Sequence, residues 1–186
     1  MTADEAAVAV IDVLERLGIR YMIVGSLASN FHGIPRSTRD ADFVVEIGPA
    51  DPQRLTDALP AALVLQPQAA FETVTGTTRH VIELARSPFV CELFVTSDDP
   101  HDRERLHRRE RVHVFGRGAY VASVEDMIVT KLRWGMHARR SKDLDDARNM
   151  IAVRGDAIDW DYVQRWTSEH GTSALLEEIR RSIPPM

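Results

Sequence analysis

The segment from residue 20 to residue 47 most constrains the fold of this chain. An apolar run at 20–24 ends at Gly25, and residues 26–32 have the length and composition of a short helix. A second apolar run at 40–47 follows, and it begins Asp-Ala-Asp. The segment therefore predicts a strand, a tight turn, a short helix and a second strand.

Hydrophobic periodicity and capping residues predict the other elements. Residues 2–17 form a helix with a capping box at Thr2 and Glu5, and the region after residue 123 is helical to its end. We expect further helices at 49–59, 124–138, 142–152, 160–169 and before Pro184, and strands near 79–85, 89–96 and 111–122, the last as a hairpin turning at 116–118. The predicted fold class is α+β: a mixed β-sheet flanked by helices, then a helical C-terminal part. We expect a core at 1–122 and a helical region at 123–186 packed on it.

Composition excludes several classes of protein. With 186 residues, 44% of them hydrophobic, the chain can bury a core, which excludes a disordered chain and a disulfide-stapled miniprotein. The single Cys91 lies in an apolar run and has no partner for an internal disulfide. No run of eighteen apolar residues is present and the first residues are acidic, so we expect a cytoplasmic protein with no membrane partner.

Positive charge is concentrated in one part of the chain. The formal net charge is −5, yet residues 101–142 hold eleven Lys or Arg against five Asp or Glu. This pattern favours a local site for a polyanion. The alternative is that the acids interleaved at 102–111 pair with the arginines there. Of 23 cationic residues 21 are arginine, and the two lysines are Lys131 and Lys142.

The Asp-Ala-Asp sequence directs two carboxylates to one side of its strand. Side chains two residues apart on a strand point the same way, so Asp40 and Asp42 lie together while Ala41 and Phe43 face the core. A hard divalent cation would relieve the repulsion between the carboxylates. The alternative is a solvated outer face of an edge strand.

The strand-to-helix turn before these acids has the features of an anion site. Free N–H groups and the positive end of the helix dipole at Gly25 and Ser26 would hold a phosphate, although a serine after a turn glycine is also an ordinary helix cap. Arg36 and Arg39 precede the acids. Each could contact phosphate or neutralise the carboxylates.

A lysine and two acids in the helical region form a second polar group. Lys131 falls on the apolar stripe of the helix 124–138, so it must meet an anion or extend its amine to solvent at the edge of the stripe. Asp143 and Asp146 share a face of the next helix, where they could orient Lys131 or Arg139, or only favour the helix dipole. Trp134, by its helical position, is predicted to lie in the core.

These patterns resemble a known family. Gly25-Ser26 followed by Asp40-Ala-Asp42 on the next strand resembles the nucleotidyltransferase superfamily with the DNA polymerase β-like fold. The longer pattern, with Lys131, Arg139 and Asp143-x-x-Asp146, resembles the AbiEii-type branch, which includes toxins of toxin–antitoxin systems. The superfamily takes a third carboxylate from a later strand, and Glu92 fits by position.

The resemblance implies a site and a cofactor. Asp40, Asp42 and Glu92 would hold Mg²⁺ or Mn²⁺, and with Lys131 they would be the catalytic residues. The nucleotide, an NTP such as ATP, would be bound by Gly25, Ser26, Arg36, Arg39, Lys131, Arg139, Asp143 and Asp146. Glu92 is also expected to take the proton from an acceptor hydroxyl.

The resemblance also implies a function and leaves alternatives open. The expected reaction is metal-dependent transfer of NMP from an NTP to RNA, tRNA or protein. The chain could be the toxin of a toxin–antitoxin system, and its expected partners are then an RNA or tRNA acceptor and a cognate antitoxin. One alternative is an antibiotic nucleotidyltransferase of the aminoglycoside or lincosamide type. The other is a degenerate, non-catalytic protein that binds a nucleotide or a partner protein, which the glutamate at the third position favours.

Overall fold

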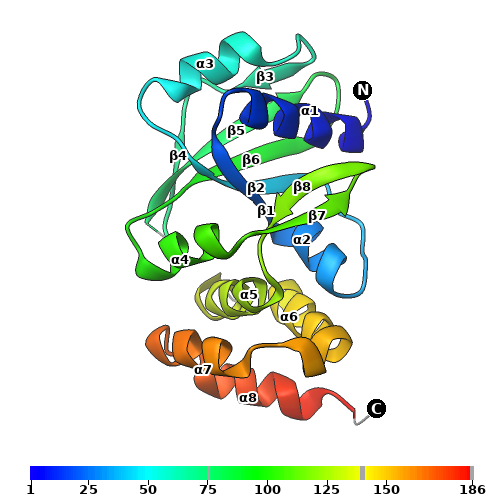
Figure 1. Cartoon of the computed structure of the whole chain (residues 1–186), viewed down its shortest axis with the longest axis vertical. Coiled ribbons are helices and arrows are strands. Elements are labelled where there is room, and N and C mark those ends of the chain that lie inside the picture. The colour runs from blue at the N-terminus through cyan, green and yellow to red at the C-terminus, as the bar shows by residue number, and fades with distance from the viewer. Residues whose placement is uncertain (75, 139–140, 185–186) are drawn as a thin grey trace.

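A computed structural model describes residues 1–74, 76–138 and 141–184. An open mixed β-sheet carries helices on both faces, and a helical C-terminal part lies beyond one of these faces (Figure 1). The predicted fold class is confirmed. The division into two domains at residue 122 stays a prediction.

The sheet places strands that are distant in sequence beside one another. Along the sheet the strand order is β3-β5-β6-β2-β1-β8-β7, and β4 pairs with β5. The first and second strands, β1 and β2, are antiparallel, whereas β2 and β6 are parallel and β6 and β5 antiparallel. The strands are β1 (Arg20–Val24), β2 (Asp40–Glu46), β3 (Leu63–Leu65), β4 (Ala70–Glu72), β5 (Thr77–Leu84), β6 (Val90–Val95), β7 (Glu110–Val114) and β8 (Arg117–Val121).

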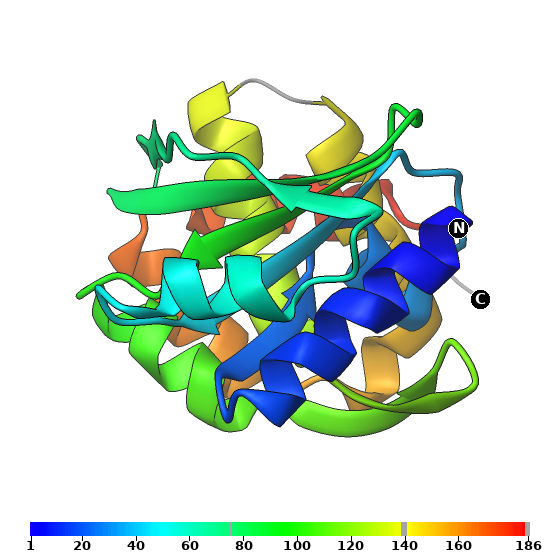
Figure 2. The ribbon, with the colours of Figure 1, turned by 90° about the horizontal axis from the view of Figure 1, so that it is seen from above.

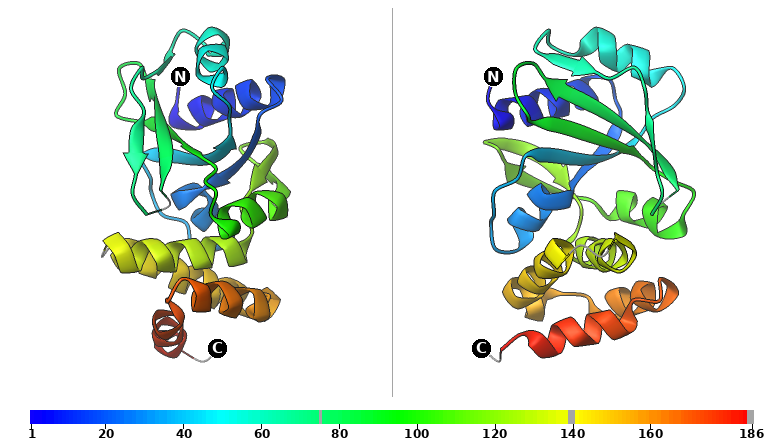
Figure 3. Two further views of the ribbon diagram at one scale, coloured as in Figure 1. Left: turned by 90° about the vertical axis from the view of Figure 1, so that its left-hand side faces the viewer. Right: turned by 180° about the vertical axis from the view of Figure 1, so that it is seen from behind.

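The helices cover the two sheet faces unequally. Figure 2 shows α1 and α3 crossing one face, while α2, α4 and the C-terminal helices lie on the other (Figures 1 and 3). None of the helices in the described residues is long and apolar enough to cross a membrane. The helices are α1 (Ala3–Arg16), α2 (Gly25–His32), α3 (Asp51–Ala58), α4 (Pro100–Arg108), α5 (Val124–Ala138), α6 (Ser141–Arg154), α7 (Trp160–Glu169) and α8 (Ser173–Ser182), with a 3₁₀ turn at Gly155–Ala157.

Most predicted elements are present close to their predicted bounds. The capping box at Thr2 and Glu5 is formed, and α5 spans the predicted residues. The hairpin after α4 turns one residue earlier than expected, at Phe115 and Gly116, which both have positive φ. Such φ values at both central residues are typical of the two-residue turns that match strand twist.

The sequence did not predict α4, β3 or β4. Helix α4 begins at a proline, its cap Asp99 accepts from two backbone N–H groups, and Leu106 is its one buried apolar side chain. Its other buried residues are His101, Asp102 and Arg105, so it lacks the apolar stripe by which a helix is recognised. Strands β3 and β4 span three residues each, too few to show alternation.

A buried polar network joins α4 to α5 and α7. The carboxylate of Asp126 accepts from the Tyr162 hydroxyl at 2.6 Å and from Ser123 Oγ at 2.8 Å, and His101 Nε2 lies 3.1 Å from it. Burial raises the pKa of Asp126, but these hydrogen bonds outweigh burial and leave that pKa below its ordinary value. Both oxygens of this carboxylate are thus occupied within the fold.

Candidate active site

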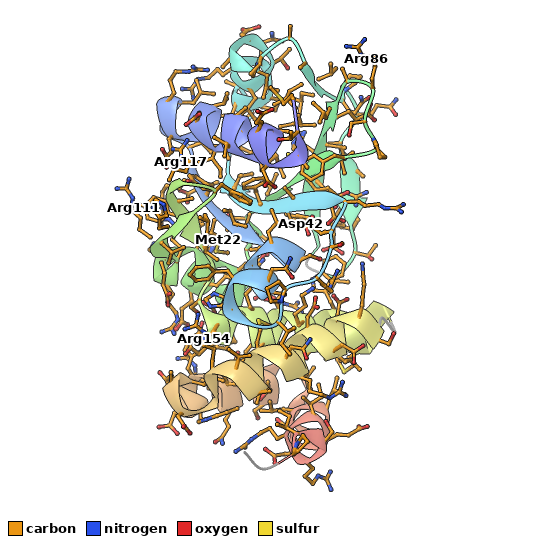
Figure 4. All side chains as sticks on the ribbon, turned by 90° about the vertical axis from the view of Figure 1, so that its right-hand side faces the viewer. Met22, Asp42, Arg86, Arg111, Arg117 and Arg154 are labelled. Atoms are coloured by element: carbon orange, nitrogen blue, oxygen red, sulfur yellow. The ribbon has the colours of Figure 1, made fainter. Side chains whose placement is uncertain are left out.

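A cleft lies between the sheet and the helices that cover the same face as the C-terminal part (Figure 1). It encloses about 880 Å³ of empty space, part of it open to solvent, and residues from β1, β2, β5, β6, α2, α4, α5 and α6 line it. Figure 4 shows Asp42 at the level between the upper sheet layer and the lower helices. Every described helix and strand that carries a predicted site residue therefore contributes to one cleft, whereas Arg36 and Arg39, in the loop between α2 and β2, do not line it.

Three carboxylates from two neighbouring strands face this cleft. Asp40 and Asp42 project from β2, and the register of the parallel pair sets Glu92 of β6 beside Asp42. Burial, then the negative charges of Asp40 and Glu92, raise the pKa of Asp42 to about 7. Thr38 Oγ1 donates to Asp40. The interpretation of Asp40 and Asp42 as a solvated outer edge is wrong, because β2 is central in the sheet.

Glu92 is held by an arginine that the sequence analysis did not identify. Arg79 Nη1, on β5, lies 3.0 Å from Glu92 Oε1. As the side chains stand, no three histidine, cysteine or acidic residues in the described part of the chain come close enough together to hold a metal ion. The donor chemistry of the three carboxylates suits a hard cation, and Arg79 competes with such a cation for Glu92.

The start of α2 lies against the carboxylate of Asp42. Gly25, the first residue of α2, has φ of 60°, and a Cβ on it would lie 1.9 Å from Asp42 Oδ2. A side chain there would therefore collide with the carboxylate, and only glycine allows the backbone this close. Ser26 follows on the first turn, buried at the cleft wall. The turn predicted as an anion site thus adjoins the carboxylates.

Lys131 faces the cleft from α5 and is paired with two acids. Its Nζ lies 2.8 Å from Asp143 Oδ1 and 2.9 Å from Asp146 Oδ2, both on α6, and the lysine is 7% exposed. The prediction that it points inward to anions is confirmed, and extension of its amine to solvent is excluded. Asp143 and Asp146 do share a face, and that face meets Lys131.

Arg36 links the turn at Ser26 to the acids of α6. Its guanidinium holds Asp146 through Nε at 2.8 Å and Nη2 at 2.9 Å, and Nη2 also donates to Ser26 Oγ at 2.9 Å. Burial raises the pKa of Asp146, but Arg36 and Lys131 outweigh it and leave that pKa below its ordinary value. A chain of contacts therefore runs from Ser26 through Arg36 and Asp146 to Lys131.

Of the three predicted nucleotide-binding arginines, the two in the described residues, Arg36 and Arg39, do not line the cleft. The side chain of Arg39 is exposed, does not line the cleft, and makes no hydrogen bond or ion pair with the described residues. Arg139 lies outside the described residues, so its predicted role stays a prediction.

The Arg-rich segment is mostly neutralised by acids. Among its described arginines, which lie between 103 and 117, only Arg105 lines the cleft, and a polyanion site on this stretch stays a prediction. Four of these arginines form ion pairs, but only Arg105 pairs with one of the acids interleaved at 102–111, so the predicted alternative holds for that arginine alone. The ion pairs join Arg103 to Asp98, Arg105 to Asp102, Arg108 to Glu125 and Asp126, and Arg117 to Asp12 and Glu15.

An aromatic pair in the cleft wall corrects another expectation. Trp134 lines the cleft from α5 and is only partly buried, so its predicted place in the core is wrong. Its ring meets that of Phe94, on β6, edge to face with centroids 6.3 Å apart. The sequence does contain a pattern that predicts this position: Trp134 follows Lys131 by three residues, which places both side chains on one helix face.

Comparison with known proteins identifies the fold. No protein-family model and no curated sequence matches the chain. Among solved structures, ANT(2″)-Ia in complex with adenylyl-2″-tobramycin matches with a TM-score of 0.65 and 9% identity, over 92% of this chain and 98% of that one. An antigenic nucleotidyltransferase-like protein from Paracoccidioides brasiliensis matches at 0.55 and 16%, over 100% and 95%. The lincosamide adenylyltransferase LnuA, lincomycin-bound, matches at 0.50 and 10%, over 80% and 96%. The chain thus has the nucleotidyltransferase fold, as the wider resemblance implied; the AbiEii-type branch is not confirmed by these matches.

Proposed function

We propose that the chain is a divalent-metal-dependent nucleotidyltransferase that moves NMP from an NTP to an acceptor hydroxyl. One observation carries the proposal: in a nucleotidyltransferase fold, Asp40, Asp42 and Glu92 line the same cleft as the start of α2 and Lys131. Carboxylates for a cation beside donors for phosphate are the equipment of phosphoryl and nucleotidyl transfer.

The carboxylates of β2 fit the metal that this reaction uses. Burial, then the negative charges of Asp40 and Glu92, raise the pKa of Asp42 to about 7, and Lys131 and Lys142 offset this only in part. Asp40 and Asp42 would hold Mg²⁺ or Mn²⁺, joined by Glu92 once it leaves Arg79. When bound, the metal supplies charge neutralisation at the triphosphate and lowers the pKa of the attacking hydroxyl.

The protein residues orient the reactants and stabilise the leaving group. The backbone N–H groups at Gly25 and Ser26 bind the β- and γ-phosphates, and Lys131 balances the charge that develops on pyrophosphate. The acceptor oxygen bonds to the α-phosphorus as the bond from that phosphorus to the β-bridging oxygen breaks. Glu92 takes the proton of the acceptor hydroxyl at a carboxylate oxygen.

The choice of acceptor follows from the charge of the cleft. Asp102, a further acid in its wall, is 2% exposed and is occupied by Arg105 at 2.7 Å and by Ser97. Asp143, the other acid of the described cleft wall apart from the three metal ligands, is paired with Lys131 through Oδ1 at 2.8 Å, while its Oδ2 has no hydrogen-bond partner. The cations of the cleft wall, Arg79, Arg105, Lys131 and Lys142, are the groups that would receive the phosphates of an RNA acceptor. We therefore keep RNA as the acceptor in this proposal, and with it the toxin role and antitoxin partner of the AbiEii-type branch.

Two other functions remain as alternatives. The antibiotic-modifying enzymes among the similar structures make an aminoglycoside or a lincosamide the competing acceptor. The pairing of Glu92 with Arg79 favours a protein that binds nucleotide without transferring it. The three functions differ in which acceptor, if any, receives the nucleotide.

The experiment compares acceptors directly. The protein is incubated with each α-³²P-labelled NTP, Mg²⁺ and either total RNA, a protein extract, tobramycin or lincomycin, in parallel with Asp42→Ala. Label on RNA that requires Asp42 supports the proposal, whereas label on a drug establishes the antibiotic alternative. If no acceptor gains label but calorimetry shows Mg²⁺-dependent NTP binding, the non-catalytic alternative is correct; absence of both results rejects nucleotide chemistry. Co-expression with the product of a neighbouring gene, scored by cell growth, tests the toxin role.

A further inference from the structure

Arg79 holds Glu92, the third carboxylate of the cleft, in an ion pair. Its guanidinium is 3.0 Å from Glu92, and the two side chains are 36% and 21% exposed. A partly exposed ion pair of this kind is weak and exchanges for a better partner. A ligand that binds Arg79 in place of Glu92 would therefore leave Glu92 free to turn toward Asp42.

The strand order shows which reactant reaches Arg79. From β1 through β2 and β6 to β5, the cleft floor carries the start of α2, then Asp42, then Glu92, then Arg79. Nucleotidyl transfer proceeds with the attacking and leaving oxygens in line. If pyrophosphate leaves beside α2 and β1, the acceptor hydroxyl approaches from the side of β6. The body of the acceptor then lies over β5, at Arg79.

The surroundings of Arg79 suit a nucleic acid. In the sheet register Arg79 lies opposite Phe94, and the Phe94 and Trp134 rings, both partly exposed, line the cleft next to it. A guanidinium binds phosphate with two parallel hydrogen bonds, and aromatic faces stack bases. A cation beside aromatic rings is the combination that proteins use for single-stranded polynucleotides.

We propose that Arg79 binds a backbone phosphate of a single-stranded RNA acceptor next to the reacting hydroxyl, and so frees Glu92 to turn to Asp42. This inference rests on the proposed function and names its acceptor. It makes Arg79 a specificity-determining residue, because an acceptor without a phosphate at that position leaves Glu92 in its ion pair.

The test measures RNA binding separately from nucleotide binding. Arg79→Gln is compared with Arg86→Gln, whose arginine is exposed, makes no side-chain hydrogen bond or ion pair with the described residues, and lies far from Asp42 (Figure 4). The probe is a fluorescent ten-nucleotide single-stranded RNA, titrated at several salt concentrations. Arg79→Gln should weaken binding about tenfold. It should also reduce the slope of log K against log salt by about 0.7, the value for one lost phosphate contact. Arg86→Gln should change neither quantity.

A second variant keeps the test informative if Arg79→Gln folds poorly. Glu92→Gln removes the competitor of the phosphate for Arg79, so it should bind the same RNA at least as tightly as the wild-type protein. Weaker RNA binding by Glu92→Gln, or unchanged RNA binding by folded Arg79→Gln, would overturn the inference. So would an acidic peptide that displaces the RNA better than unlabelled RNA does, since it would identify a protein acceptor.

Calorimetry with a non-hydrolysable NTP and Mg²⁺ distinguishes this inference from the proposed function. Wild-type protein that binds no NTP contradicts the proposed function whatever the RNA result. Normal NTP binding in both proteins, with equal RNA affinity, contradicts the role of Arg79 alone. NTP binding that weakens in Arg79→Gln as much as RNA binding does would assign Arg79 to the nucleotide and overturn the inference.

Discussion

Asp42 in the cleft and Asp126 in the helical region are both largely removed from water, yet their surroundings differ. Asp126 accepts hydrogen bonds from Tyr162 and Ser123 and adjoins His101, and its pKa is lowered. Asp42 is bordered by Asp40 and Glu92, and its pKa is raised to about 7. Both environments cost desolvation energy, and only the first recovers it inside the protein.

The difference separates a structural carboxylate from a functional one. A carboxylate whose donors are all supplied by the fold stabilises the fold, and its removal leaves other buried groups without a partner. A carboxylate set beside like charges destabilises the protein until a cation arrives, which is a common arrangement at catalytic sites.

The largest effect is expected from Asp42→Asn. Transfer should fall by about 10³-fold, as for loss of an electrostatic group that acts in the transition state. In EDTA at pH 8 the Tm should stay the same or rise by about 2–4 °C, because a repelling charge is removed. Labelled-NMP transfer and thermal unfolding measure the two quantities. A variant that is both active and less stable would place Asp42 with Asp126 as a structural residue.

The converse variant is Asp126→Ala. Removal of one partner from the buried network should lower the free energy of unfolding by about 3 kcal/mol. The corresponding fall in Tm is about 6–12 °C for a chain of this length. Calorimetric NTP binding at a temperature where the variant is folded should match the wild type. A stable variant with weakened NTP binding would contradict the comparison.

Lys131 shares features with both carboxylates. Like Asp126 it is buried and paired within the fold, and like Asp42 it lines the cleft. Lys131→Arg keeps the charge next to Asp143 and Asp146 but replaces a compact ammonium by a planar fork. We expect KM for the NTP to rise about tenfold, equivalent to one lost charged contact, with a Tm change of less than about 3 °C. Wild-type kinetics with a large fall in Tm would make Lys131 a structural residue only.

The smallest effect concerns acid pH in the helical region. Burial, then the charges of Arg133 and His101, lowers the pKa of His170 to about 4. The unfolded chain therefore binds a proton that the folded chain does not, so the stability contributed at neutral pH is lost as pH falls from about 6.5 to about 4. His170→Gln should remove about 1 kcal/mol of this loss in urea unfolding, a value discounted for partial exposure. The exposed His113→Gln is the control, and equal pH profiles of wild type and His170→Gln would contradict the assignment.

Local patterns predicted the parts of the site that depend on one element. The alternation of a strand was enough to set Asp40 and Asp42 on one face, and the helical period was enough to turn Lys131 inward. Contacts between distant elements were not predictable in this way. The pair of Arg79 and Glu92 depends on the register of β5 against β6, which no local pattern encodes. Similarly, α4 was missed because polar groups rather than apolar ones hold it to the fold.

The parallel register of β2 and β6 has a consequence for changes in chain length. Glu92 reaches the cleft because it is the direct neighbour of Asp42 in the sheet, while Cys91 and Leu93 are fully buried on the opposite face. The segment between residues 46 and 90 forms α3, β3, β4 and β5, and the turns that join these elements do not set that register. Insertions in those turns should leave the site intact, whereas a one-residue deletion inside β6 would exchange the carboxylate for a thiol or a leucine.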